Sequence, residues 1–238
     1  MRKILFLLIC IGRWNSPAFS QGNGGLQYNG GPRYDDAQFW QNIYFEKNVS
    51  GKFNAHINEE GRITENLQRP SYIYLDLGLT YKPKKHLHLT LAYVPIASRL
   101  RTDFTSYRHQ FYADVVFKIK YRNFVFYDRQ MFQIQYNDVN RAKNWDISNN
   151  YIRNKLTAKY RSGESRYIPY LAAEFYYQTN ADQYNGVQSD RMRYFIGCFY
   201  EMNKVSMVEI YYLIEPHYNI PAPFTNYIIG IGYAHDIY

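Results

Sequence analysis

The sequence predicts an all-β fold, an up-and-down antiparallel transmembrane β-barrel of about 12 strands, with about 10 as the alternative. Three observations support this prediction. Segments of about 10 to 12 residues alternate apolar and polar side chains, which is the length and period of strands that cross a membrane at a tilt. Short and long connections alternate between these segments, as on the two rims of an outer-membrane barrel. The amino terminus reads as a secretory signal.

The amino terminus predicts secretion. Arg2 and Lys3 precede a short apolar run at residues 4–11, and a small-x-small cleavage site ends at Ser20, which is the organisation of a signal peptide. The residues that follow are rich in glycine and asparagine and predict a flexible chain. The sequence therefore divides into a signal peptide at residues 1–20, a flexible lead-in at 21–35 and a barrel at 36–238.

The composition fits a secreted β protein. Cleavage would leave 25 lysines and arginines against 20 acidic residues, a modest positive charge that does not by itself imply a nucleic-acid partner, and secretion argues against one. No stretch approaches the roughly 20 apolar residues of a membrane helix, and the mean hydropathy is -0.52. Tyrosine and phenylalanine number 27 and 15, which suits the aromatic girdles of a membrane barrel. Cleavage would leave Cys198 as the only cysteine, so that no intrachain disulfide can form.

Eleven segments of the chain have the strand pattern. Bacterial single-chain barrels have even strand numbers, so we prefer a twelfth strand at residues 26–35. The alternatives are that the glycine-rich lead-in passes through the lumen, or that one of the eleven segments extends outside the membrane. The eleven predicted strands are residues 37–47, 52–63, 71–82, 86–95, 107–119, 123–136, 150–161, 167–178, 190–201, 204–215 and 225–237.

The hairpin YIYLDLGLTYKPKKHLHLTLAYV, residues 72–94, displays the two faces of these strands. Apolar residues take alternate positions from Ile73 to Leu79 and again from Leu87 to Leu91. This face would contact lipid in a barrel and a second sheet in a secreted β-sandwich binding module. The strand lengths and the order of the connections favour lipid, and the β-sandwich is kept as an alternative.

Charged side chains occupy the opposite face, which is the lumen of a barrel. Guanidinium groups bind carboxylates through paired hydrogen bonds, so we interpret these charges as a structural ion-pair network that fills the barrel. The alternative is a narrow anion-preferring pore with an arginine selectivity ring. The predicted lumen charge network consists of Glu60, Arg62, Asp76, Asp114, Arg129, Arg153, Glu174, Arg191, Arg193 and Glu209.

Several short motifs lie in a set order from Asp36 to the end of the chain. They are Trp40 in the first strand, EEGRITEN (59–66), YRHQFYADV (107–115), NYIRNKLTAKY (150–160), IPYLAAEFYY (168–177), DRMRYFIGCFY (190–200) and the closing glycine-aromatic strand. Their order resembles an uncharacterised family of Gram-negative outer-membrane β-barrel proteins, domain of unknown function 2490. The sequence YDRQMFQIQY departs from that pattern, because Arg129 stands alone where such proteins often carry an Arg-x-Arg pair. The resemblance implies an outer-membrane location and carries no established activity.

The sequence predicts no catalytic site, no cofactor and no metal site. An outer-membrane lipid hydrolase, a further alternative, needs a serine beside a histidine and an orienting group, and no serine here has a recognisable nucleophile setting. His86 and His88 have a spacing that can chelate a metal, but no third ligand is evident. The expected partners are outer-membrane lipid and the barrel assembly machinery, with no nucleic acid and an unknown substrate.

Overall fold

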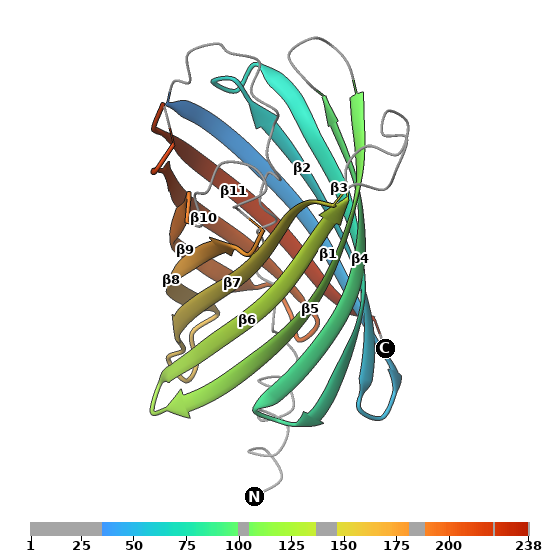
Figure 1. Cartoon of the computed structure of the whole chain (residues 1–238). Helices are drawn as coiled ribbons and strands as arrows, with labels where there is room; N and C mark the ends of the chain where they lie inside the picture. Colours follow the sequence, from blue (N-terminus) through green and yellow to red (C-terminus); the bar gives the residue numbers. More distant parts are fainter. Residues whose placement is uncertain (1–34, 100–104, 137–146, 181–188, 221, 238) are drawn as a thin grey trace, which may run out of the picture.

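The chain forms one β-sheet that closes into a barrel, shown in Figure 1. The computed structural model describes residues 35–99, 105–136, 147–180, 189–220 and 222–237. The predicted signal peptide and nearly all of the lead-in lie outside these residues. No helix in this part of the chain is long and apolar enough to cross a membrane. The strands are β1 (Asp36–Ser50), β2 (Phe53–Thr64), β3 (Arg69–Lys84), β4 (Leu87–Arg99), β5 (Thr105–Tyr121), β6 (Phe124–Tyr136), β7 (Ile147–Tyr160), β8 (Tyr167–Gln178), β9 (Met192–Glu201), β10 (Ser206–His217) and β11 (Phe224–Ile237).

The eleven strands coincide with the eleven predicted segments, but the expectation of twelve or ten strands is wrong. Each strand pairs antiparallel with the next along the chain, whereas β1 and β11 run parallel, from Asp36 beside Asn226 to Lys47 beside Ile237. With an odd number of alternating strands, the first and last point the same way, so only a parallel pair can close the barrel. The barrel is therefore mixed rather than wholly antiparallel, and closure needs no twelfth strand.

Closure of all eleven strands into one sheet also makes the β-sandwich alternative wrong, because a sandwich needs two facing sheets. The two rims of the barrel differ in the length of most of their connections, although the connection at 65–68 is shorter than the one at 161–166. One rim carries the turns at residues 51–52, 85–86, 122–123, 161–166 and 202–205, and we call it the short-turn rim. The other carries the connections at 65–68, 100–104, 137–146, 179–191 and 218–223, and we call it the long-loop rim.

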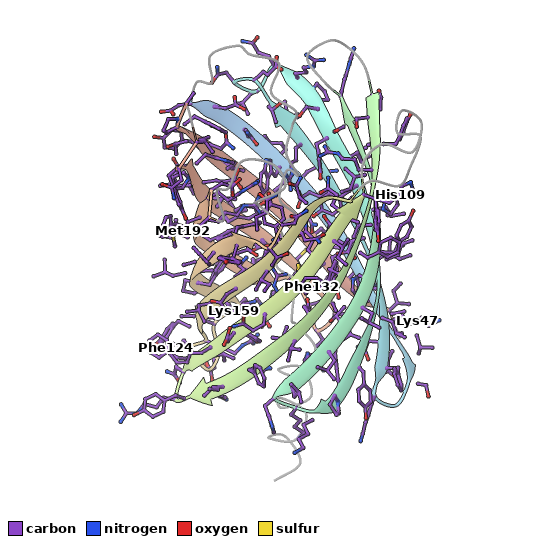
Figure 2. The ribbon with its side chains drawn as sticks, viewed as in Figure 1. Lys47, His109, Phe124, Phe132, Lys159 and Met192 are labelled. Carbon is purple, nitrogen blue, oxygen red and sulfur yellow. The ribbon has the colours of Figure 1, made fainter. Side chains whose placement is uncertain are left out.

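The two faces of the hairpin are as predicted. Leu75, Leu77, Leu79, Leu89 and Leu91 are exposed on the outside of the barrel, while the residues between them point inward and are mostly buried. Figure 2 shows side chains projecting from both faces of the strands. Since alternate residues of a strand point to opposite faces, the same division runs around the whole barrel.

Inward-facing glycines make room for large inward side chains. A Cβ atom at Gly230 would lie 2.0 Å from Cζ of Tyr211, and one at Gly78 would lie 2.1 Å from Cε1 of His56. Neither position can carry a side chain unless the ring beside it moves. At these two positions the interior is therefore occupied by side chains of the strands.

Candidate functional site

The ten charged residues predicted for the lumen are all buried. Their exposed fractions run from 0 to 6 %, and they lie on the inward positions of strands β2, β3, β5 to β7, β8, β9 and β10, or next to a strand end in the case of Arg191. The alternation of faces places them there, and burial of so many charges requires that they be paired. Their contacts divide them into a central cluster, two smaller groups and three further residues.

Glu174 is the centre of the largest cluster. Its Oε1 accepts hydrogen bonds from Nη2 of Arg129 at 2.7 Å and from Nη2 of Arg153 at 2.8 Å. Its Oε2 accepts a hydrogen bond from the Tyr176 hydroxyl at 3.3 Å and lies 3.8 Å from Nη1 of Arg193. One carboxylate on β8 thus binds arginines from β6, β7 and β9, which ties four consecutive strands together across the inner surface.

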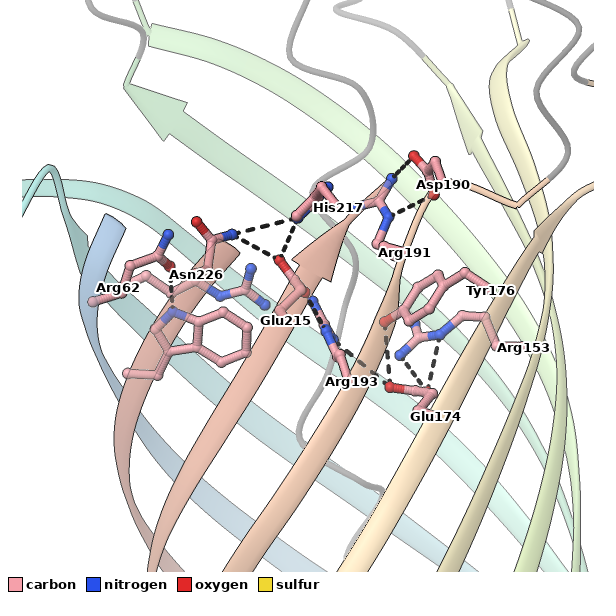
Figure 3. Close-up of polar contacts among 12 residues, drawn as sticks. Arg62, Arg153, Glu174, Tyr176, Asp190, Arg191, Arg193, Glu215, His217 and Asn226 are labelled. Atoms are coloured by element: carbon pink, nitrogen blue, oxygen red, sulfur yellow. Dashed lines mark hydrogen bonds and ion pairs between the residues drawn. The ribbon is translucent and has the colours of Figure 1, made fainter. Parts of the chain in front are cut away.

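Glu215 is a second carboxylate in this cluster, and Arg193 joins the two. Arg193 donates from Nε to Oε2 of Glu215, while Nε2 of His217 and Nδ2 of Asn226 each lie 2.9 Å from Oε1 of Glu215. Figure 3 shows these contacts running along the wall of the barrel from Glu174 to Asn226. The chain of contacts therefore continues through β10 to β11.

Aromatic rings hold the guanidinium groups from the side. The Cζ atom of Arg62 lies 3.7 Å from the centre of the Trp40 ring, and that of Arg193 lies 5.2 Å from the same ring. The Cζ atoms of Arg153 and Arg193 lie 4.6 Å and 5.1 Å from the centre of the Tyr176 ring. Cation–π contacts of this kind fix the direction of a guanidinium without neutralising its charge. Trp40 therefore links β1 to the arginines of β2 and β9.

Glu60 and Asp76 form smaller groups of their own. Glu60 accepts hydrogen bonds from Nε of Arg62 at 2.6 Å and from the Tyr74 hydroxyl at 2.9 Å. Asp76 accepts one from the Tyr112 hydroxyl at 2.8 Å and lies 3.3 Å from Nε2 of His56. Glu60 is thus bound from its own strand β2 and from β3, and Asp76 on β3 is bound from β2 and β5.

Arg191, Asp114 and Glu209 are the remaining residues of the predicted network, and Arg191 reaches the cluster through the Tyr176 ring, whose centre lies 5.3 Å from its Cζ atom. Arg191 is at the long-loop rim, where it donates to both oxygens of Asp190, at 2.9 Å and 2.8 Å, and to the Tyr151 hydroxyl at 3.1 Å. Burial raises the pKa of Asp190, but the charge and hydrogen bonds of Arg191 outweigh burial and hold this pKa below its ordinary value. Oδ1 of Asp114 and Oε2 of Glu209 are buried without a hydrogen-bond partner in the described structure.

The cluster is suited to a structural role, because its carboxylates bind several guanidinium groups and aromatic rings pack against those groups. In the part of the chain that the structure describes, no three or more His, Cys, Asp and Glu side chains come together in a way that could hold a metal ion. Glu215 and His217 belong to the cluster but were not predicted as lumen residues, since Glu215 is the last residue of the predicted strand 204–215 and His217 lies beyond it. Extending the alternation of β10 by two inward positions past Leu213 would have found both.

A family model described as "Protein of unknown function (DUF2490)" matches residues 37–222. The match runs from the second residue of β1 to just before β11, and it contains every residue of the predicted lumen charge network. No curated protein matches the chain.

Proposed function

The chain belongs to the DUF2490 family of proteins of unknown function, and we propose that it is an integral β-barrel of the outer membrane. In this proposal its charged interior is a structural ion-pair network, and the protein is not an enzyme. Its partners are outer-membrane lipid and, during assembly, the barrel assembly machinery. The alternating faces, the closed barrel and the predicted signal peptide support this reading.

The observation that carries the proposal is the apolar outer surface. Every one of the eleven strands exposes large apolar side chains, so that the surface surrounds the barrel rather than forming a patch on one side. Soluble monomers rarely expose a continuous apolar surface of this extent, whereas a lipid-facing barrel requires one. Examples from each strand in turn are Ile43, Ile57, Leu77, Leu91, Phe111, Phe132, Leu156, Leu171, Ile196, Ile210 and Ile229.

Two outward carboxylates interrupt this surface, and each is bound by a side-chain amide. Nε2 of Gln41 lies 3.0 Å and 2.8 Å from the two carboxylate oxygens of Glu59. Nδ2 of Asn154 donates to Oδ1 of Asp128 at 2.8 Å. Hydrogen bonds of this kind lower the cost of placing a carboxyl group against lipid, so the two positions are compatible with a membrane surface.

Fractionation tests the location. We expect the mature protein to be found with outer membranes and to need detergent for extraction, because its outer surface is apolar. Unboiled protein should also migrate differently from boiled protein on a denaturing gel, since a closed barrel resists the detergent until it is heated. Recovery of the folded protein in the periplasm, soluble without detergent, would exclude the membrane barrel and leave a secreted soluble barrel.

A narrow anion-preferring pore is the second candidate, and the arginines of the interior favour it. If the ion pairs block the lumen, the protein reconstituted in a planar bilayer should show little or no steady conductance. If the barrel is a pore, it should conduct with a preference for anions, and Arg191→Glu combined with Arg193→Glu should weaken or reverse that preference. Steady anion-selective conductance would therefore replace the structural interpretation of the network.

A further inference from the structure

The positively charged residues of the interior change from arginines to lysines between the central cluster and the short-turn rim. Along the inward positions of β7, Tyr151 and Arg153 are followed by Lys155 and Lys159, and Lys118 of the inner face of β5 lies at the same end of the barrel. The arginines of the central cluster are bound by carboxylates, whereas the positions nearer the short-turn rim carry lysines. Lys155 is only 5 % exposed, and Lys159, labelled in Figure 2, is half-buried.

The ammonium groups of these lysines contact rings. Nζ of Lys155 lies 3.7 Å from the centre of the Phe195 ring, and Nζ of Lys159 lies 3.9 Å from that of Phe199. Lys159 and Lys118 approach the Tyr127 ring as well, at 5.4 Å and 5.6 Å. We call this group the lysine chamber: Lys118, Lys155, Lys159, Tyr127, Phe195 and Phe199.

Lys155 and Lys159 differ from the arginines of the cluster in having no carboxylate within ion-pair distance in the described structure. An ammonium group has three hydrogen-bond donors, and a cation–π contact with a ring face does not replace the hydrogen bonds that they can form. The rings therefore fix the position of one buried and one half-buried ammonium group and leave their hydrogen-bond donors available. A buried charge in this state favours the entry of an anion.

Glu209 is the carboxylate of β10 opposite Phe199 in the strand register. Its Oε2 is buried without a hydrogen-bond partner among the described atoms. Its charge interacts with those of Lys155 and Lys159, but in the described structure it forms no ion pair with either lysine. Toward the short-turn rim the inner face becomes more accessible, because Arg153 is fully buried whereas Thr157 and Lys159 are half-buried. A ligand would accordingly enter from this rim.

We propose that the lysine chamber binds a small organic anion, a carboxylate or phosphate ester that carries an aromatic or acyl body. The anionic group is bound by Lys155 and Lys159, and the body packs on Phe195, Phe199 and Tyr127. The inference rests on the interior of the barrel and not on its location. If the protein proves soluble, the same measurement is made in buffer, so the two proposals fail separately.

Calorimetric titration of the folded mature protein in a neutral detergent tests the site. Phenyl phosphate is the probe, and benzyl alcohol is the uncharged control of similar shape. We expect saturable binding of phenyl phosphate that weakens as the salt concentration rises, and at least tenfold weaker binding of benzyl alcohol. Absence of saturable binding, or equal binding of both compounds, would overturn the proposal.

Three variants locate the binding. Lys155→Met together with Lys159→Met should weaken phenyl phosphate binding at least tenfold, whereas Lys47→Met, which removes an exposed lysine on the outside of the barrel, should leave it unchanged. Glu209→Gln should tighten binding several-fold, because it removes a negative charge from the chamber, and loss of folding cannot produce such a gain. Unchanged affinity in both the double variant and Glu209→Gln would place the probe elsewhere and overturn the site.

Discussion

Glu174→Gln is expected to lower the free energy of unfolding by about 3–5 kcal/mol, the usual cost of removing one partner from a buried ion pair. Glutamine keeps the shape of the side chain but not its charge. Arg129 and Arg153 would then lose the acceptor that they share at 2.7 Å and 2.8 Å. The urea dependence of unfolding, followed by the gel shift between folded and unfolded barrel, measures the effect.

Glu201→Gln is the matched control for this prediction. Glu201 accepts a hydrogen bond from Nη2 of Arg161 at 2.7 Å, but the side chains of this pair are about one quarter exposed. Partly solvated pairs contribute about 0–1 kcal/mol, so this variant should lose little. Equal losses in the two variants would show that the central cluster contributes no more than a pair at the rim.

Leu91→Arg is expected to destabilise the barrel by about 2–4 kcal/mol in a bilayer, the cost of an arginine on the lipid face near the midplane. Leu91 is 69 % exposed on the outer face and lies opposite Ala113, the middle residue of β5. A charge at this height cannot easily reach either interface. Unfolding in urea from phospholipid vesicles gives the free energy directly.

Thr90→Arg is the control on the inner face of the same strand. Thr90 is 9 % exposed and lies opposite Asp114 in the register, whose carboxylate could bind the new guanidinium. We therefore expect a smaller loss than for Leu91→Arg. A larger loss for Thr90→Arg, or no loss for Leu91→Arg in vesicles, would contradict a lipid-facing outer surface.

The strands and their faces could be predicted because both follow from a period of two along the chain. From Ile73 to Leu79, each apolar side chain fixes the side on which its neighbours lie, and no distant contact is needed. The same reasoning selected ten charged residues that are buried in the structure. The alternation of residues was sufficient to predict strand positions and side-chain faces, because both depend on neighbouring residues alone.

The closure of the barrel and the partners of the ion pairs could not be predicted from the alternation of residues. The parallel pair of β1 with β11 joins segments at the two ends of the chain, as the 190-residue separation of Asp35 and Thr225 illustrates. The choice of Glu174 as the common partner of Arg129, Arg153 and Arg193 depends on the order and tilt of the strands. His217 was missed because Pro216 before it is typical of a loop, although both residues lie at the end of β10.

The parallel closure also decides how the chain could be rearranged or extended. β1 begins at the long-loop rim and β11 ends at the short-turn rim (Figure 1), so partners fused directly before Asp36 and after Ile237 would be displayed on opposite ends of the barrel. A circular permutant would need a linker that covers its height, about 35–40 Å for a tilted strand of this length. That is about a dozen fully extended residues, whereas a barrel with an even number of strands could be permuted with a short turn.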